Sequence, residues 1–231
     1  MPNNNKIEEI IRDSLKKSKD QKKEHYLFGR ILVYVKDPVL PNVDMSSMLG
    51  KIESLIPPHL MEEVDEIFIG SFGENEEREL EAHYESGAIY IASDLPTSGD
   101  YIENIVHETA HAVEAQRGLE IYGDKKIEQE FLGKRERLAA TLESHGIDVS
   151  HLDFLDPDYT PELDSFLYKE IGYDNMHSLT MGLFSSPYGV TSLREYFANG
   201  FEEFFLGNRE FLKRTSPELF SKLMGVILDD I

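Results

Sequence analysis

The residues best suited to chemistry are two histidines one helical turn apart, with a glutamate beside the first. His107, Glu108 and His111 stand in the run His-Glu-Thr-Ala-His. Side chains four residues apart share one face of a helix, so both imidazoles can bind the same zinc ion while the carboxylate acts as a general base. The alternative is a core helix that carries two histidines by chance, but buried imidazoles would then need other partners to offset their desolvation. We therefore expect one catalytic zinc ion (Zn²⁺) at this motif.

The residues around the motif predict that it lies within a helix over 98–118. Asp100 is a favourable N-cap, and Glu103 follows three residues later, as in a capping box. Gly118 is a favourable C-terminal stop. The apolar residues that recur at helical spacing between them are Ile102, Ile105, Val106, Ala110 and Val113.

A catalytic zinc ion usually has three protein ligands and one open position, so a third ligand must come from elsewhere in the chain. The sequence does not continue as a metzincin, because Glu114 stands where that pattern needs glycine and Arg117 where it needs histidine. A carboxylate on a later helix, predicted over 191–206, is the better candidate. There Glu195 and Asn199 stand one turn apart beside an aromatic stripe. Glu195 can therefore point inward as a ligand, while Asn199 supports it or a histidine.

Other titratable residues remain open as third ligands. Glu128 and Glu130 are nearer in sequence, but they lie in a densely charged stretch and we interpret them as solvated. Glu202 and Glu203, on the same predicted helix as the favoured ligand, are not ligand candidates and are interpreted as a solvated face. The further candidates, for which no spacing argument exists, are His145, His151 and Asp153.

The run from Ser186 to Phe201 carries a family resemblance. It is Ser-Pro-Tyr-Gly-Val-Thr-Ser-Leu-Arg-Glu-Tyr-Phe-Ala-Asn-Gly-Phe. With the upstream His-Glu-x-x-His, this run resembles the catalytic domain of anthrax lethal factor and the clostridial Pro-Pro endopeptidases. In that family a Tyr-Gly pair precedes a Glu-aromatic-Phe-Ala helix, and the tyrosine lies seven residues before the glutamate. Tyr188 and Glu195 have this spacing.

The resemblance, which covers at most residues 79–231, implies a role for each matching residue. His107, His111 and Glu195 would be the zinc ligands, and Glu108 the general base. Tyr188 would donate a hydrogen bond to the oxyanion of the transition state.

The chain departs from the family pattern in two places. Asn199 occupies a position where an acidic residue is expected in relatives. The stretch between His111 and Glu195 is longer than in relatives, which implies an inserted helical segment over 124–147 that could alter or cover the cleft.

The remaining hydrophobic patterns predict the elements that position these residues. The expected fold is α+β and zincin-like, with a small mixed sheet followed by a mostly helical half that contains the active-site helix. The predicted strands are 30–36, 66–70, 79–85 and 88–92, the last two forming a hairpin around Ser86-Gly87, and the predicted helix among them is 44–56.

The chain divides into two predicted parts. Residues 1–29 form an N-terminal helical arm, since residues 5–24 are polar with sparse apolar positions at helical spacing. Residues 30–231 form the zincin-like metallopeptidase domain.

The strand just before the zinc helix is a candidate for substrate binding. If it lies at the edge of the sheet, an extended peptide could pair with its backbone and cross the metal site. The alternative, of equal weight, is an ordinary strand that is paired on both sides. The predicted substrate-binding residues are Ala88, Ile89, Tyr90 and Ile91.

Composition excludes several classes of function. Among 231 residues, 40% are hydrophobic and 29% charged, which is typical of a folded domain, and no cysteine is present to form disulfides, thiolate metal sites or a cysteine nucleophile. The formal net charge of −21 disfavours nucleic acids and favours basic substrates. No apolar run is long enough to cross a bilayer. No signal peptide is recognisable, so we expect a cytoplasmic protein unless a signal was removed or export uses another route.

The sequence thus predicts a zinc metalloendopeptidase that hydrolyses protein or peptide substrates. Its zinc-bound water would lose a proton to Glu108. The alternative is a catalytically silent protein-binding module with the same zincin fold.

Overall fold

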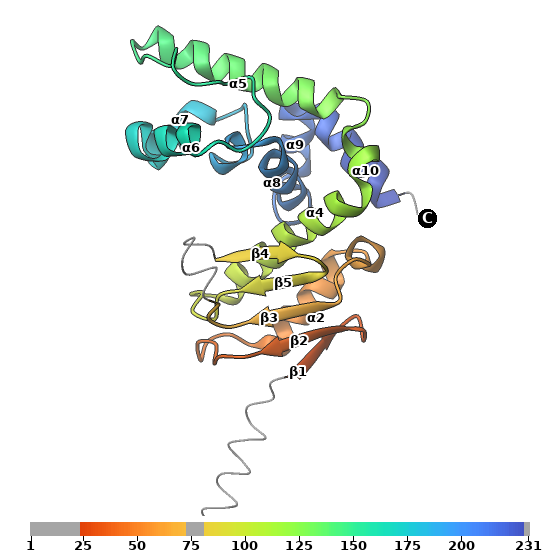
Figure 1. Cartoon of the computed structure of the whole chain (residues 1–231). Coiled ribbons are helices and arrows are strands. Elements are labelled where there is room, and N and C mark those ends of the chain that lie inside the picture. The colour runs from red at the N-terminus through yellow and green to blue at the C-terminus, as the bar shows by residue number, and fades with distance from the viewer. Residues whose placement is uncertain (1–23, 73–80, 229–231) are drawn as a thin grey trace, which may run out of the picture.

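The computed structural model describes residues 24–72 and 81–228, which form a five-stranded mixed sheet and a group of helices beyond one edge of it (Figure 1). The strand order is β1-β2-β3-β5-β4. The two central pairings, β2 with β3 and β3 with β5, are parallel, and the two outer ones are antiparallel. The α+β class is therefore confirmed. The strands are β1 Glu24–Leu27, β2 Ile31–Val35, β3 Glu66–Ile69, β4 Ala82–Glu85 and β5 Ala88–Ile91.

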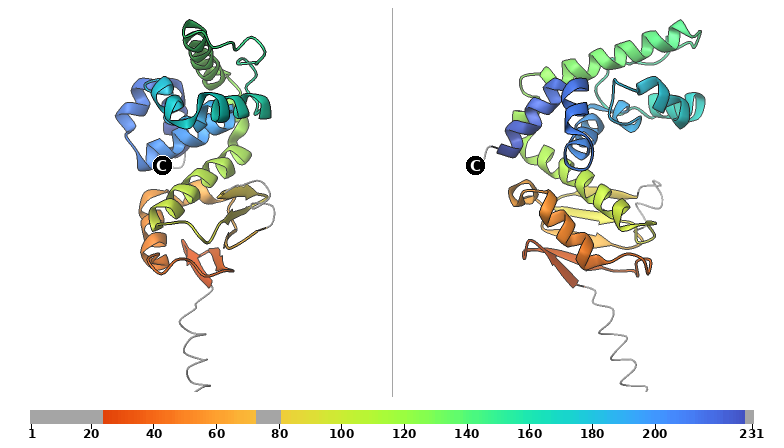
Figure 2. Two further views of the ribbon diagram at one scale, coloured as in Figure 1. Left: turned by 90° about the vertical axis from the view of Figure 1, so that its left-hand side faces the viewer. Right: turned by 180° about the vertical axis from the view of Figure 1, so that it is seen from behind.

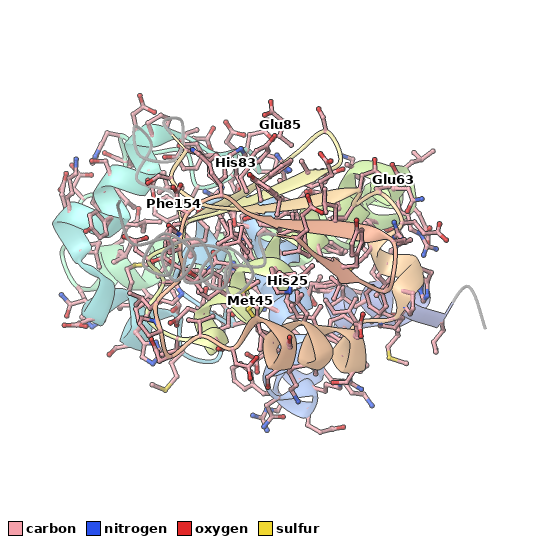
Figure 3. All side chains as sticks on the ribbon, turned by 90° about the horizontal axis from the view of Figure 1, so that it is seen from below. His25, Met45, Glu63, His83, Glu85 and Phe154 are labelled. Atoms are coloured by element: carbon pink, nitrogen blue, oxygen red, sulfur yellow. The ribbon has the colours of Figure 1, made fainter. Side chains whose placement is uncertain are left out.

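Helices α2 (Met45–Leu55) and α4 (Ser98–Tyr122) cover one face of the sheet (Figure 2). Met45, at the start of α2, lies across the sheet from His83 and Glu85 of β4 (Figure 3). Side chains of β3 alternate between the two faces accordingly: Ile67 and Ile69 are fully buried, while Glu66 and Phe68 are half-buried. The predicted strands over 30–36 and 66–70 and the predicted helix over 44–56 are confirmed.

The predicted hairpin is also confirmed. Ser86 and Gly87 turn the chain with φ of 48° and 89°. Two successive residues with positive φ match the right-handed twist of a two-residue hairpin, which is why glycine is favoured there. The hairpin places β5 inside the sheet, between β3 and β4.

This placement makes the edge-strand hypothesis for β5 wrong. Both backbone edges of β5 are used in the sheet, so Ala88, Ile89, Tyr90 and Ile91 cannot pair with a substrate backbone. Of the two possibilities, β5 is the ordinary paired strand. The outermost strand on that side is β4.

The predicted boundary of the N-terminal arm at residue 29 is wrong. Residues 24–27 form β1, which pairs antiparallel with β2 and buries Leu27 completely. The connecting turn uses Phe28 and Gly29, with φ of 53° and 68°, and a positive φ at phenylalanine is not a recognisable turn signal in the sequence. The rest of the predicted arm, residues 1–23, lies outside the described residues.

Helix α4 is longer than predicted at its C-terminal end and is capped differently. Its N-cap is Thr97, and Asp100 is the third helical residue of a capping box, with its carboxylate accepting from the Thr97 amide at 2.7 Å. Gly118 does not end the helix. Non-helical angles at Arg117 mark a kink instead, and the helix continues to Tyr122.

The rest of the described chain is mostly helical, as predicted. Helix α5 (Lys126–Ser144) forms most of the predicted segment 124–147 and lies beyond α8, on the side away from the sheet (Figure 1). One hydrophobic cluster joins the sheet to these helices. No helix in the described ranges is both long and apolar enough to cross a membrane. The remaining elements are η1 Pro58–Met61, α6 Pro161–Ser165, the π-helical turn η2 Phe166–Ile171, α7 Tyr173–Thr180, η3 Tyr188–Val190, α8 Leu193–Leu206, α9 Arg209–Thr215 and α10 Pro217–Leu228.

Candidate metal centre

Helices α4 and α8 bring His107, His111 and Glu195 together. One possible ligand atom from each residue lies within 4.8 Å of the others. Nε2 of His107 is 3.1 Å from one oxygen of the Glu195 carboxylate, and Nε2 of His111 is 3.6 Å from the other. Two imidazole nitrogens and one carboxylate are a donor set that suits zinc. The three residues are therefore close enough to bind one metal ion.

The position of Glu195 follows from how α8 begins and packs. The Ser192 hydroxyl accepts a hydrogen bond from the Glu195 amide at 3.1 Å, which caps the helix and places the carboxylate in its first turn. The predicted aromatic stripe packs α8 into the core, with Phe197 and Phe201 completely buried. Burial of this stripe fixes the rotation of α8 about its axis and turns Glu195 toward α4.

The second nitrogen of each imidazole faces another carboxylate. Nδ1 of His107 lies 3.4 Å from Glu202, and Nδ1 of His111 lies 3.3 Å from Glu114. Such carboxylates orient metal-binding histidines and leave the other nitrogen, Nε2, for the metal. Both Nε2 atoms here face Glu195, so the orientation fits a metal site.

Neither supporting carboxylate is among the site residues predicted from the sequence. Glu202 was interpreted as part of a solvated face, but it lies seven residues after Glu195, which is two helical turns on the same face of α8. Glu114 stands three residues after His111 and is buried. The i to i+3 spacing on a predicted helix was the signal that could have found Glu114.

Glu114 is held by three donors. Besides His111, it accepts from the Tyr122 hydroxyl at 2.6 Å and from Arg194 Nε at 2.9 Å. Burial alone would raise its pKa, but these hydrogen bonds outweigh burial and hold the Glu114 pKa below its usual value. The carboxylate therefore stays ionised and keeps the His111 ring in place.

The three central groups stabilise one another electrostatically. Burial disfavours the charged imidazoles, but hydrogen bonds to carboxylates outweigh it and raise the pKa of His107 to about 10 and that of His111 to about 9. Burial likewise opposes ionisation of Glu195, but the two histidines lower its pKa to about 2. The carboxylate is thus available as an anion, and a bound cation would replace the protons on the imidazoles.

Glu108 lies beside this cluster, on the side toward the sheet. Its side chain is 6% exposed and lies near the backbone of Tyr84 in β4, which favours the ionised form. Burial raises the pKa of Glu108, and the neighbouring histidines counteract part of that effect. A carboxylate with a raised pKa is well suited to exchange a proton near neutral pH.

Tyr188 lies at the open side of the cluster. It begins the 3₁₀ turn η3, its ring centroid is 6.5 Å from that of His107, and it is 38% exposed. Burial of the phenol and the charge of Glu195 raise the pKa of Tyr188, which keeps the hydroxyl protonated. The structure thus places a hydrogen-bond donor next to the predicted ligands.

Asn199 does not support the ligands in the predicted way. Its amide nitrogen donates to the backbone carbonyl of Glu195 at 2.8 Å, not to the carboxylate or to a histidine. Its amide oxygen accepts from the Ser186 hydroxyl. Asn199 therefore connects α8 to the start of the Tyr188 turn, a role that the i to i+4 spacing could not reveal.

The alternative third ligands have other partners. Glu130 accepts from the Tyr196 hydroxyl at 2.8 Å and from two amides at the start of α10, so its interpretation as solvated is wrong. Glu128 forms an exposed ion pair with Lys125. Asp153 accepts from a nearby backbone amide, His145 lies 2.8 Å from the carbonyl of Thr141, and the His151 ring contacts that of Phe166. Among the described residues, the group that could hold a metal is that of α4 and α8.

Comparison with known proteins assigns this chain to no family. The chain matches no protein-family model, and no curated protein or solved structure proved significantly similar to it. The functional assignment therefore depends on the residues of the site themselves.

Proposed function

We propose that this protein is a zinc-dependent metalloendopeptidase with a zincin-like fold and a site like that of the lethal factor catalytic domain. One observation carries the proposal: His107 and His111 from α4 meet Glu195 from α8, more than eighty residues later, while each Nδ1 faces a carboxylate. A core helix with two unrelated histidines would not be expected to gather three carboxylates around them.

The donor set determines the metal and its chemistry. His107, His111 and Glu195 would hold zinc through two nitrogens and one carboxylate, which is a ligand set of catalytic zinc sites. Zinc bound there would lower the pKa of a water molecule and polarise the carbonyl of the scissile peptide bond.

Glu108 would move the proton. Its carboxylate accepts a proton from the attacking water and later delivers that proton to the nitrogen of the leaving amine, so the group ends in its starting state. The nearby backbone of Tyr84 in β4 favours the ionised form that accepts the proton. Burial supports this role by raising the Glu108 pKa, because the protonated intermediate state then costs less free energy.

Tyr188 would stabilise the transition state. The phenol stays protonated, and its ring lies beside His107. It can therefore donate a hydrogen bond to the oxygen of the substrate carbonyl as negative charge develops there.

The substrate would lie along β4 rather than β5. Among the described residues β4 is the outermost strand on this side, and the backbone of its Tyr84 is near enough to Glu108 to influence the pKa of that carboxyl. No described strand pairs with the outer edge of β4, so an extended peptide that pairs there would pass close to the general base. This arrangement suits a protein or peptide substrate in an extended conformation.

Metal analysis combined with a peptide-library assay tests the proposal. We expect about one zinc ion per chain in both the wild type and Glu108→Gln, with cleavage in the wild type alone; loss of the general base should lower turnover by about 10²–10⁴-fold. Zinc without cleavage of any library would contradict the proposal and favour the catalytically silent binding module.

A further inference from the structure

Arg135 is a completely buried cation that lies on α5, outside the metal centre. All three of its hydrogen bonds go to backbone carbonyls. Nε donates to Val190 at 2.9 Å, one terminal nitrogen donates to Thr191 at 3.2 Å, and the other donates to Asp156. Val190 and Thr191 are the residues that connect Tyr188 to α8, so one planar group holds two successive carbonyls of that connection.

Thr191 transmits this restraint to Tyr188. Its amide donates to the Tyr188 carbonyl at 3.0 Å, and its hydroxyl donates to the same oxygen at 2.8 Å. The guanidinium of Arg135 therefore holds one side of Thr191, while the backbone of Tyr188 is bound to the other side. Thr191 is thus the one residue that links Arg135 to Tyr188, the proposed oxyanion donor, through hydrogen bonds.

Glu195 is less dependent on this restraint. Its position is set by the Ser192 cap and by the buried aromatic stripe of α8. The Tyr188 ring is 38% exposed, so fewer side-chain contacts hold it. Loss of the Arg135 hydrogen bonds should consequently displace Tyr188 more than it displaces the metal ligands.

The chemistry of arginine fits a role in holding the backbone of residues 190 and 191 better than a role in stabilising the fold. Burying a charge costs free energy, and apolar residues of similar volume often stabilise a core equally well or better. Burial lowers the pKa of Arg135 to about 10, and Asp156 and Asp153 counteract only part of this effect. In return, the rigid guanidinium plane holds several acceptors in a fixed relative position, which a lysine ammonium on a flexible stem cannot do.

We infer that Arg135 is a positioning residue that holds the Tyr188 turn beside the metal centre. The inference rests on the proposed peptidase function for its catalytic consequence. It also makes α5, the segment that lengthens the chain between the two motifs, part of the site rather than a peripheral addition.

A double-mutant cycle of Arg135→Lys and Tyr188→Phe tests the inference. Because a displacement of about 1 Å can cost on the order of 10²-fold in rate, Arg135→Lys should lower kcat by roughly 10- to 100-fold while zinc content is unchanged. In the Tyr188→Phe background, the same substitution should lower kcat by less than about twofold, because the two residues act as a unit. The matched control is Arg137→Lys on the exposed face of α5, which should leave kcat and KM unchanged.

Additive losses of kcat, or loss of zinc in Arg135→Lys, would overturn the inference, because Arg135 would then act through another residue. Amide hydrogen exchange provides a readout that needs no activity. Exchange in residues 186–194 should rise in Arg135→Lys while exchange in residues 105–111 stays the same. Unchanged exchange in 186–194, or a uniform rise along the chain, would contradict the inference. If the wild type cleaves nothing, the proposed function fails, but the exchange result still decides whether Arg135 positions the turn.

Discussion

The two sides of the candidate site are held in different ways. On the ligand side, between α4 and α8, side chains hold side chains: His107 faces Glu202, and His111 faces Glu114. On the open side, Tyr188 is held through its backbone, by Thr191 and behind it by Arg135. Carboxylates in the immediate surroundings can thus preorganise a metal site, whereas the partly exposed Tyr188 turn depends on backbone hydrogen bonds from the residues behind it. Substitutions on the two sides should therefore have different effects.

The largest effect should come from removing the carboxylate that joins α4 to α8. Glu195→Ala deletes one of three predicted ligands, so zinc binding and peptide cleavage should both fall to background. Zinc content after dialysis and turnover of a library-derived peptide are the measurements. Glu136→Ala, at an exposed position on α5, is the control. Full zinc occupancy in Glu195→Ala would exclude Glu195 as a ligand.

A substitution on the open side should affect turnover without affecting the metal. Tyr188→Phe removes only the hydroxyl, so we expect kcat to fall by about 10²–10³-fold. Zinc content should match that of the wild type. Measuring kcat and KM separately checks this, since a loss confined to KM would make Tyr188 a substrate contact and not an oxyanion donor.

The two supporting carboxylates allow a comparison within the ligand side. Glu114→Gln should weaken zinc binding by about 10–100-fold, as is usual for residues that orient a ligand. Glu202→Gln should have a smaller effect, because the Glu202 side chain is 35% exposed and lies 3.4 Å from its histidine. Competition with a chelator gives both affinities. Equal losses of zinc affinity in the two variants would show that burial of the supporting carboxylate does not influence zinc binding.

Outside the site, the buried Lys134 of α5 should make stability depend on pH. It donates to the Tyr196 hydroxyl at 2.6 Å and to Ser216 at 2.5 Å, and burial lowers its pKa to about 8, although Glu130 counteracts part of this. Between pH 8 and about 10.4, the usual pKa of lysine, the unfolded state binds more protons, so this group adds stability as the pH rises. Below pH 8, Lys134 is charged in the folded state, so the full free-energy cost of burying its charge lowers stability.

Urea unfolding of the wild type and Lys134→Met at pH 7 and pH 10 measures this contribution. The difference in unfolding free energy between the two proteins should move in favour of the wild type as the pH rises. Taking the difference removes the effect of the other titrating groups. A difference that is independent of pH would show that Lys134 keeps an ordinary pKa.

The smallest effect concerns the charge of the substrate. With a net charge of −21, the protein should attract basic peptides, and salt should screen that attraction. We expect KM for a basic peptide to rise a few-fold between about 0.05 and 0.5 M salt, and KM for a neutral analogue to stay constant. Identical behaviour of the two peptides would remove net charge as a source of specificity.

The sequence predicts well those features that depend on local spacing. The helical periodicity around His107 and His111 predicts α4, and the aromatic stripe predicts α8 and the inward direction of Glu195. The short apolar runs over 30–36 and 66–70 predict β2 and β3. Each of these features is encoded within about ten consecutive residues, where the period of the structure appears directly in the chain.

Features that depend on distant parts of the chain are not predictable in this way. The position of β5 inside the sheet is set by its pairing with β3, some twenty residues earlier, and β1 depends on a turn at Phe28 with a positive φ. The role of Glu202 depends on the packing of α8 against α4, which gives a seemingly solvated residue a half-buried histidine, His107, as its partner. Arg135 could not be distinguished from the other charged residues of α5 because its three acceptors are backbone carbonyls 21, 55 and 56 residues away.

Helix α4 physically connects the sheet to the helical half of the molecule. It spans 25 residues, with a kink at Arg117, and lies against the sheet at one end and among the helices at the other (Figure 2), with His107 and His111 near its middle. An ion shared with Glu195 would crosslink α4 to α8 at this midpoint. Binding to the native state alone stabilises it by mass action, so zinc should raise the melting temperature of the sheet and the helical half together, as a single transition.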